Sequence, residues 1–134
     1  MPTNATPDVV RARAARTAVL AFAGDAVVVL WFAATGRGFH NETNPVLGVL
    51  ATAWPFLIGL ALAWLLPLVR RRPLAVWPAG PVVWLGTYVV GMVLRGVTGA
   101  GLAVPFLVVA LCVLGAALVG WRALVLLIRR WVRR

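Results

Sequence analysis

Asp25 is the acidic residue in this chain that stands inside a long apolar stretch, so its carboxyl group is the first candidate for chemistry. It lies about eight residues, or roughly 12 Å of helix, beyond the predicted start of the first span at Thr17. A charged carboxylate without a partner at that depth costs several kcal/mol. The neighbouring spans offer no basic residue at the same predicted level. We therefore expect Asp25 to be largely protonated and to face the interior of a helix bundle.

Three potential hydrogen-bond donors fall at the same predicted depth on the third span. They are the Trp84 indole, the Thr87 hydroxyl and the Tyr88 hydroxyl. A polar cluster of Asp25 with these side chains has two interpretations, and both are open. It is either a binding site for a proton or cation, because intramembrane acids are functional candidates, or a set of structural contacts between helices.

A second polar cluster is predicted at the outer rim and comprises Arg37, His40, Glu42 and Arg95. Arg37 and Arg95 end two spans that run outward, and arginine suits the negative end of a helix dipole. Glu42 can pair with either arginine, and we favour this structural role. The alternative is an entrance that attracts anions or titrates through His40.

Signals for catalysis, metal binding or a cofactor are missing from the sequence. Cys112 is the single cysteine, so an internal disulfide is not expected, and a lone histidine does not make a metal site. No spacing suggests a nucleophile with its base or a phosphate-binding loop. We predict no catalytic residue, no metal and no cofactor. We favour a protein that is not an enzyme, although an outer pocket joining His40, Glu42 and Arg95 would reopen that question.

The composition indicates a membrane protein. The chain has 134 residues, of which 63% are hydrophobic, and its mean hydropathy is +0.97. A soluble domain of this length cannot bury so much apolar surface. The net charge of +10 comes from arginines that flank apolar stretches. Such arginines orient spans and contact anionic lipid headgroups, so the partner they predict is the bilayer and not a nucleic acid.

The arginines also predict the topology, because positive charge stays on the cytoplasmic side of a membrane. Eleven of the thirteen fall in three clusters that alternate with pairs of spans, and Arg37 and Arg95 lie elsewhere. Both termini should therefore be cytoplasmic. The clusters are Arg11, Arg13 and Arg16; Arg70, Arg71 and Arg72; and Arg122, Arg129, Arg130, Arg133 and Arg134.

The predicted fold is all-α: a polytopic integral membrane protein with a bundle of four transmembrane helices. Residues 1–16 form a basic cytoplasmic tail, for which a helix from Val9 is one option. Residues 17–128 form the transmembrane domain, and residues 129–134 form a basic cytoplasmic end. Each span has roughly the 20 apolar residues that a bilayer requires. The helices are expected over residues 17–35, 46–69, 76–94 and 102–121, with the last extending to 128.

Two further patterns support this arrangement. Tryptophans fall at both predicted interfaces, where aromatic belts occur: Trp31 and Trp54 at the outer one, and Trp64, Trp77, Trp121 and Trp131 at the inner one. Small residues four apart allow helices to approach closely, and self-association is the less favoured use of them. These pairs are Gly59 with Ala63, Thr87 with Gly91, and Ala116 with Gly120.

The order of fixed polar and aromatic residues resembles a family, the domain of unknown function 3054, whose members are small membrane proteins of GC-rich bacteria. The resemblance covers the chain from Asp25 to Trp121, and Gly38-Phe39 departs from the expected pattern in an exposed loop. It implies the four-helix fold and no activity. The matching residues are Asp25–Phe32, Gly36-Arg37 and His40; Thr52–Leu57 with Gly59 and Trp64; Trp77-Pro78 with Gly80; Val83-Trp84 with Thr87; and Gly91-Met92, Leu94-Arg95, Gly99 and Gly101.

Two functions stay open from the sequence. The first is a small transporter or channel that uses Asp25 as its coupling or binding group. The second is a structural or accessory subunit of a larger membrane complex, as a homo-oligomer or with another membrane protein. The expected location is the inner (cytoplasmic) membrane of a bacterium, which the chain crosses several times. A bacterial source is expected because the chain has arginine but no lysine and is rich in Ala, Val and Gly, a composition that suggests a GC-rich genome. An Asp25 beside a hydrated cavity would favour transport, and a dry, packed Asp25 would favour the accessory role.

Overall fold

The structure is a computed structural model that describes residues 5–37 and 44–134, and all of its regular elements are helices. Four of these helices are long and apolar enough to cross a membrane. The all-α prediction with four spanning helices is therefore confirmed. The elements are α1 (Pro7–Arg37), α2 (Pro45–Leu65), α3 (Pro67–Arg71), α4 (Ala79–Val97) and α5 (Val104–Val132).

The ends of α2 follow from local residue types. Asn44 caps its start, because the side-chain oxygen accepts a hydrogen bond from the backbone N–H of Leu47 at 3.2 Å. Pro45 then occupies the first turn, where a missing N–H does no harm. At the other end Leu66 is extended, with φ −69° and ψ 128°, since the following Pro67 disfavours helical backbone there. The predicted second helix, 46–69, is thus divided into α2 and the short α3.

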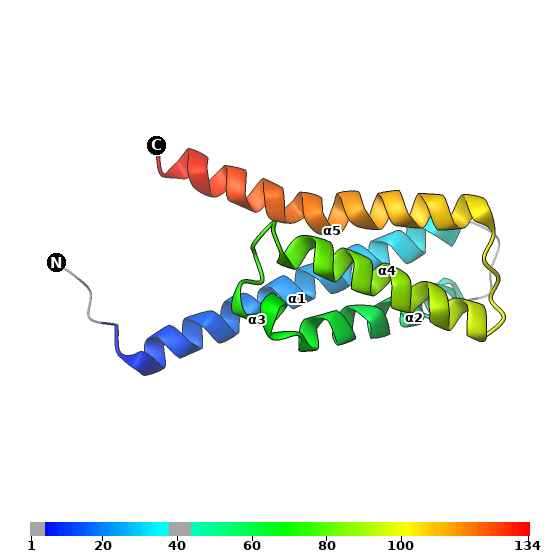
Figure 1. The fold of residues 1–134 in the computed structure, drawn as a ribbon, viewed down its shortest axis with the longest axis horizontal. Helices are drawn as coiled ribbons and strands as arrows, with labels where there is room; N and C mark the ends of the chain where they lie inside the picture. The colour runs from blue at the N-terminus through cyan, green and yellow to red at the C-terminus, as the bar shows by residue number, and fades with distance from the viewer. Residues whose placement is uncertain (1–4, 38–43) are drawn as a thin grey trace.

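The first and last helices are longer than predicted. α1 already begins at Pro7, so most of the expected tail is helical, and α5 runs on to Val132. Their 31 and 29 residues correspond to about 46 Å and 43 Å of helix, more than a hydrocarbon core of about 30 Å. Both protrude from one end of the bundle, where the two termini lie (Figure 1).

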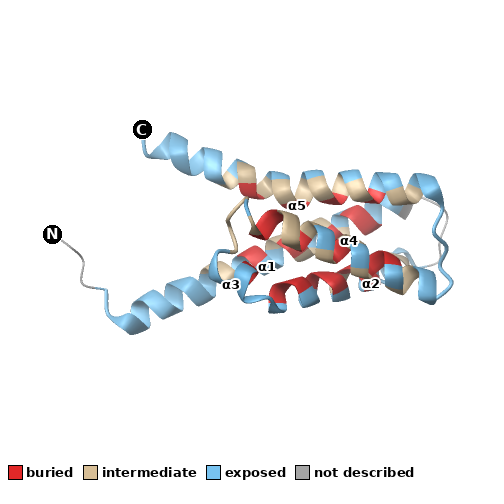
Figure 2. Cartoon of the chain, viewed as in Figure 1, coloured by how far each residue is buried: buried red, intermediate tan, exposed pale blue. Residues whose placement is uncertain are grey.

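The four long helices pack as a ring in the order α1, α2, α4 and α5, with α5 closing against α1. The buried residues lie along the faces of the helices that point into the bundle (Figure 2). On α5 they form a stripe that repeats every fourth residue, at Ala110, Leu114, Leu118 and Arg122. This spacing places the four side chains on one face of a helix, so Arg122 stands at a core position.

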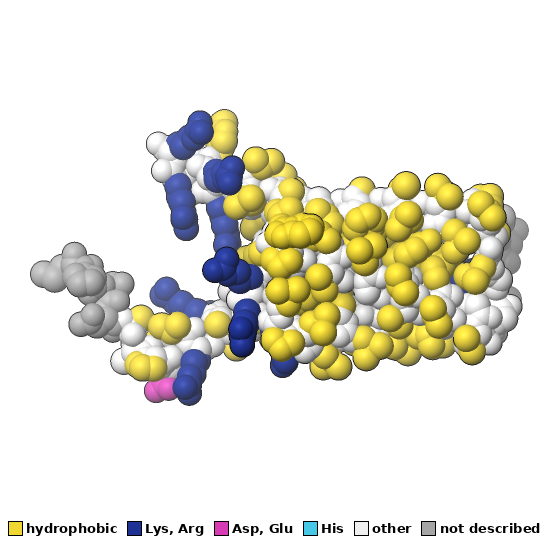
Figure 3. Space-filling model, viewed as in Figure 1, with side chains coloured by type: hydrophobic (Ala, Val, Ile, Leu, Met, Phe, Trp, Pro, Cys, Tyr) yellow, Lys and Arg dark blue, Asp and Glu magenta, His cyan; other side chains and the backbone are white. Residues whose placement is uncertain are grey.

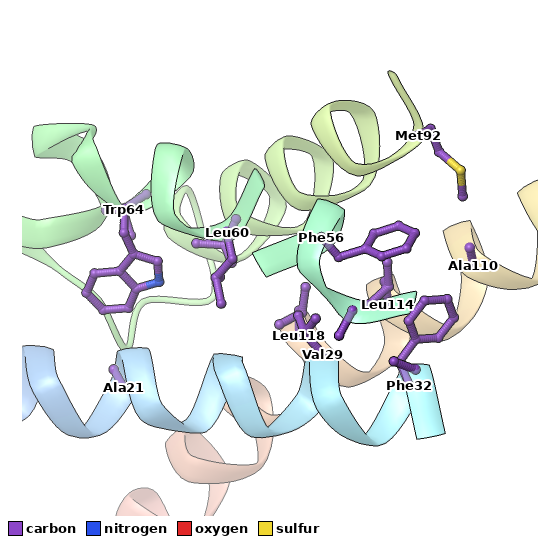
Figure 4. Packing of buried hydrophobic residues seen from close by; sticks show 14 residues of the cluster. Ala21, Val29, Phe32, Phe56, Leu60, Trp64, Met92, Ala110, Leu114 and Leu118 are labelled. Atoms are coloured by element: carbon purple, nitrogen blue, oxygen red, sulfur yellow. The ribbon is translucent and has the colours of Figure 1, made fainter. Parts of the chain in front are cut away.

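The half of the core away from the protruding helix ends is aromatic. The rings of Phe32 from α1 and Phe56 from α2 meet edge to face, with centroids 5.4 Å apart and planes at 83°. Figure 4 shows these two rings pointing toward one another near Leu114 of α5. The other half of the core contains the polar group described below.

α2 and α4 approach so closely that only glycine fits at their crossing. A Cβ atom on Gly59 would lie 2.9 Å from the carbonyl oxygen of Thr87, and one on Gly86 would lie 2.9 Å from Cβ of Ala63. The packing predicted for Gly59 and Ala63 is confirmed. A Cβ on Gly120 would meet nothing within 4 Å, so that glycine is not used for packing within the described chain.

Arginine side chains gather around the end of the molecule that carries both termini, and the lateral surface is largely apolar (Figure 3). The clustering that the sequence predicted on one side is therefore present in the structure. Which side of the membrane this end faces stays a prediction based on the positive-inside rule.

Candidate functional site: a buried ion pair between Asp25 and Arg122

The central polar group of the bundle is a two-pronged ion pair between α1 and α5. Arg122 Nη1 donates to Asp25 Oδ1 and Nη2 donates to Asp25 Oδ2, each at 2.7 Å. Both residues have no exposed surface. Paired, parallel hydrogen bonds between guanidinium and carboxylate are among the strong contacts in proteins and fix the relative orientation of the two groups.

Two tryptophans complete the surroundings of the carboxylate. Trp64, the penultimate residue of α2, donates its indole N–H to Asp25 Oδ2 at 2.9 Å. Trp121 on α5 donates to Oδ1, also at 2.9 Å. Each carboxylate oxygen thus accepts two hydrogen bonds. An ionised carboxylate has about four acceptor positions, so all of them are occupied by protein donors.

Arg122 is anchored by more than Asp25. Its Nε donates to the carbonyl oxygen of Pro73 at 2.9 Å, and its Nη1 donates to that of Leu118 at 2.9 Å. The guanidinium carbon also lies 4.8 Å from the centroid of the Trp121 ring, within the range of a cation–π contact. Pro73 lies in the connection between α3 and α4, so one side chain joins α1, α5 and that connection.

Two glycines border this group, and a Cβ atom on either would make only ordinary van der Waals contact. A Cβ atom on Gly24 would lie 3.6 Å from the Trp121 ring, and one on Gly80 would lie 3.8 Å from Cδ of Arg122. The ring of Phe22 packs edge to face on Trp64, at 5.5 Å between centroids. The pair is thus surrounded by close contacts from α1, α2, α4 and α5.

Burying two charges is expensive, and their attraction compensates only when the geometry is good and the remaining hydrogen bonds are satisfied. Both conditions hold here, because the carboxylate is saturated and the guanidinium also binds backbone oxygens. The arrangement is suited to holding helices in one register. It leaves no free acceptor on Asp25 for an added cation.

The partners predicted for Asp25 on the third span are not its hydrogen-bond partners. Trp84 donates its indole N–H to the carbonyl oxygen of Leu111 at 2.9 Å, and Tyr88 donates its hydroxyl to that of Leu107 at 3.1 Å. Both bonds join α4 to α5. The Thr87 hydroxyl is buried and has no hydrogen-bond partner in the described structure. The expectation that Asp25 faces the bundle interior agrees with its burial.

The expectation of a protonated Asp25 was based on the supposed absence of a basic residue at its level. Arg122 removes that basis. It had been grouped with the basic C-terminal end, seven residues before Arg129, and assigned to lipid headgroups. One signal was available: Arg122 interrupts an apolar run at the position that continues the buried stripe of Leu114 and Leu118.

Trp64 and Trp121 were likewise missed as site residues, although their predicted depth agrees with the structure. Both were placed at the inner interface, and Asp25 was placed deeper. In the structure the carboxylate lies level with the end of α2 and the beginning of α4, close to the arginine-rich end. It is about 18 Å of helix away from Arg37, where α1 ends.

The family assignment follows from a sequence comparison. The family described as "Protein of unknown function (DUF3054)" matches residues 22–125. The chain belongs to this family. The matched segment contains Asp25, Trp64, Trp121 and Arg122, whereas residues 7–21 of α1 and 126–132 of α5 lie outside it. No curated protein and no solved structure matches the chain.

The predicted outer-rim cluster is only partly described. His40 and Glu42 lie outside the described residues, and α1 ends at Arg37. Arg95 donates to the carbonyl oxygens of Gly101 at 3.0 Å and Ala100 at 3.2 Å. Its guanidinium also lies 4.3 Å from the centroid of the Phe106 ring. Arg95 therefore holds the connection between α4 and α5, and its proposed pairing with Glu42 stays a prediction.

Residues 5–37 and 44–134 contain no group of three His, Cys, Asp or Glu side chains that could hold a metal ion. Cys112 is exposed on the lateral surface of α5. The chemistry of the described bundle is thus concentrated in the Asp25–Arg122 pair and its two tryptophans.

Proposed function

We propose that this protein is a structural or accessory subunit of a larger membrane complex, in which the Asp25–Arg122 pair fastens the helix bundle. The observation that carries the proposal is that every hydrogen-bond acceptor position of the Asp25 carboxylate is occupied by a protein donor. Both of its oxygens accept two protein hydrogen bonds, and the residue has no exposed surface. A dry and fully bonded acid suits a structural role.

Transport through Asp25 receives less support from the same geometry. A carrier group has to exchange its ligand with water, whereas Asp25 could accept a proton or cation only after losing part of its bond to Arg122. Breaking a buried ion pair on one side costs about 3–5 kcal/mol. Such a cost at every cycle makes the pair a poor coupling site unless another event supplies the energy.

The lateral surface gives the accessory role a means of action. Large apolar side chains are exposed on all four long helices, including Trp31, Leu62, Leu85 and Val109. In a membrane these side chains contact lipid or another protein. With short connections between α3, α4 and α5, a partner inside the bilayer has most of the bundle surface available to it.

Two measurements on the full-length protein test the proposal together. After extraction from its host membrane in mild detergent, native mass spectrometry should show the chain at fixed stoichiometry with other membrane subunits. Purified protein in liposomes should carry no proton or cation flux above that of empty liposomes. A chain that is extracted alone and carries a flux in liposomes would contradict the accessory role.

A charge-free double variant, Asp25→Leu with Arg122→Met, separates the two roles further. Leu retains the branching of the Asp25 side chain, Met retains the unbranched stem of Arg122, and removing both charges together avoids a stranded charge. If Asp25 is structural, the folded double variant retains the assembly of the wild type. Loss of a wild-type flux in a folded double variant would instead support transport.

A further inference from the structure

The arginine-rich end contains a small pocket between α1, the connection before α4, and α5. It has a volume of about 160 Å³ and lies close to the ion pair, because Trp121 forms part of its wall. Its lining residues are Thr17, Leu20, Ala21, Leu74, Trp121 and Arg129.

The lining changes from apolar to polar toward the end of the molecule. On α1, Thr17 lies about 6 Å of helix nearer that end than Ala21, and on α5, Arg129 lies about 12 Å nearer it than Trp121. The other two lining residues, Leu20 and Leu74, are apolar. A phospholipid has the same order of groups, with acyl chains inside the bilayer and phosphate at its surface.

The charge around the mouth of the pocket favours an anion. Arg13 precedes Thr17 by four residues on α1, so it falls on the helix face that forms the pocket. Arg133 caps the end of α5, four residues after Arg129. Figure 3 shows the arginines of this end surrounding the gap between the two protruding helices. Basic pockets between transmembrane helices are suited to anionic lipid headgroups.

We propose that this pocket binds one anionic phospholipid, with its phosphate on Arg129 and the Thr17 hydroxyl and an acyl chain along Leu20, Leu74 and the Trp121 ring. Arginine presents a planar set of donors that matches phosphate. The inference goes beyond the accessory role and does not depend on it. It also links the lipid to the core, since Trp121 donates its indole N–H to Asp25.

The test uses the full-length protein in detergent with phosphatidylglycerol and phosphatidylcholine that have the same acyl chains. Native mass spectrometry should show one phosphatidylglycerol retained per chain, and less phosphatidylcholine. Arg129→Gln should weaken retention of phosphatidylglycerol about tenfold, as expected for losing a hydrogen bond between charged groups. Arg130→Gln is the matched control, because it removes the same charge from the neighbouring residue, which does not line the pocket. It should change retention by less than about twofold.

A second variant tests the acyl-chain part without changing the charge. Leu20→Trp places a larger side chain in the pocket and should reduce retention of phosphatidylglycerol, while circular dichroism confirms the helical fold. Equal losses in Arg129→Gln and Arg130→Gln would mean general attraction to a basic surface and would overturn the proposal. Displacement of the lipid by inorganic phosphate at equal concentration, or a lipid-free dimer that excludes phosphatidylglycerol, would overturn it too.

Discussion

Removing the arginine of the buried pair should destabilise the bundle far more than removing both charges. Arg122→Met preserves an unbranched side chain but leaves Asp25 with only the Trp64 and Trp121 donors. Stranding one charge of a buried pair costs about 3–5 kcal/mol. The carbonyl oxygen of Pro73 also loses its bond to Arg122. We therefore expect Arg122→Met to lower the free energy of unfolding by about 3–5 kcal/mol.

Asp25→Leu alone should cost a similar amount, because it strands the guanidinium. If the two changes were independent, the double variant would lose about 6–10 kcal/mol, the sum of the single losses. Instead it strands no charge. It leaves the buried Trp64 N–H without an acceptor, at about 1–3 kcal/mol for a buried group, whereas the Trp121 N–H is only part-buried. Replacing both charges by apolar groups offsets this by about 1–4 kcal/mol. The double variant should therefore unfold within about 3 kcal/mol of the wild type.

Reversible unfolding in mixed micelles with increasing fractions of sodium dodecyl sulfate, followed by circular dichroism, gives the four free energies of this cycle. We expect the two substitutions to be coupled by about 3 kcal/mol or more. Additive losses to within about 0.5 kcal/mol would show that Asp25 and Arg122 do not act as a pair. That result would refute the ion pair as the element that fastens the bundle.

Other changes test separate parts of the structure. Trp64→Phe retains the aromatic packing but removes the hydrogen bond to the carboxylate, and thermal unfolding should show a loss of about 1–2 kcal/mol; an unchanged stability would mean that this bond contributes nothing. Gly59→Ala should lower the free energy of unfolding by about 1–3 kcal/mol, because it forces α2 and α4 apart. Gly120→Ala is the control: its Cβ would meet open space, so the change should be neutral or stabilising by about 0.4–1 kcal/mol. Similar effects at both positions would contradict the close crossing of α2 and α4. In intact cells, Asn41→Cys should react with an impermeant thiol reagent from outside and Arg71→Cys should not; the reverse pattern would invert the predicted topology.

The fold was accessible from the sequence because a bilayer imposes strong and simple constraints on apolar length and on arginine placement. Those constraints identified the four spans and the basic end. They did not give the ends of the helices in the basic segments. Residues 7–16 are polar enough to read as a tail, yet they continue α1 in helical register. Pro67 did carry a usable signal, because the residue before proline tends to leave the helix.

The site was only partly accessible. Asp25 was recognised because a lone acid in a span is unusual, but its partner was 97 residues away in the chain. The sequence gives only the predicted depth of each residue in the membrane as a guide to contacts between helices. An error of one or two helical turns in that depth is enough to select Trp84 and Tyr88 on α4 instead of Arg122 on α5. Arg122 was assigned to the basic C-terminal end, and its position in the buried stripe of α5 was therefore overlooked. Pairs between distant helices depend on rotation about each axis, which apolar length does not determine.

The most direct test of the account is whether the charge-free double variant still forms the complex of the wild type in host membranes. Tagged wild type and the Asp25→Leu, Arg122→Met variant would be extracted at matched expression and compared by native mass spectrometry. The account predicts the same associated subunits at the same stoichiometry, because both residues have no exposed surface and the apolar replacements keep the bundle folded. A folded double variant that loses a proton or cation flux measured for the wild type would contradict it.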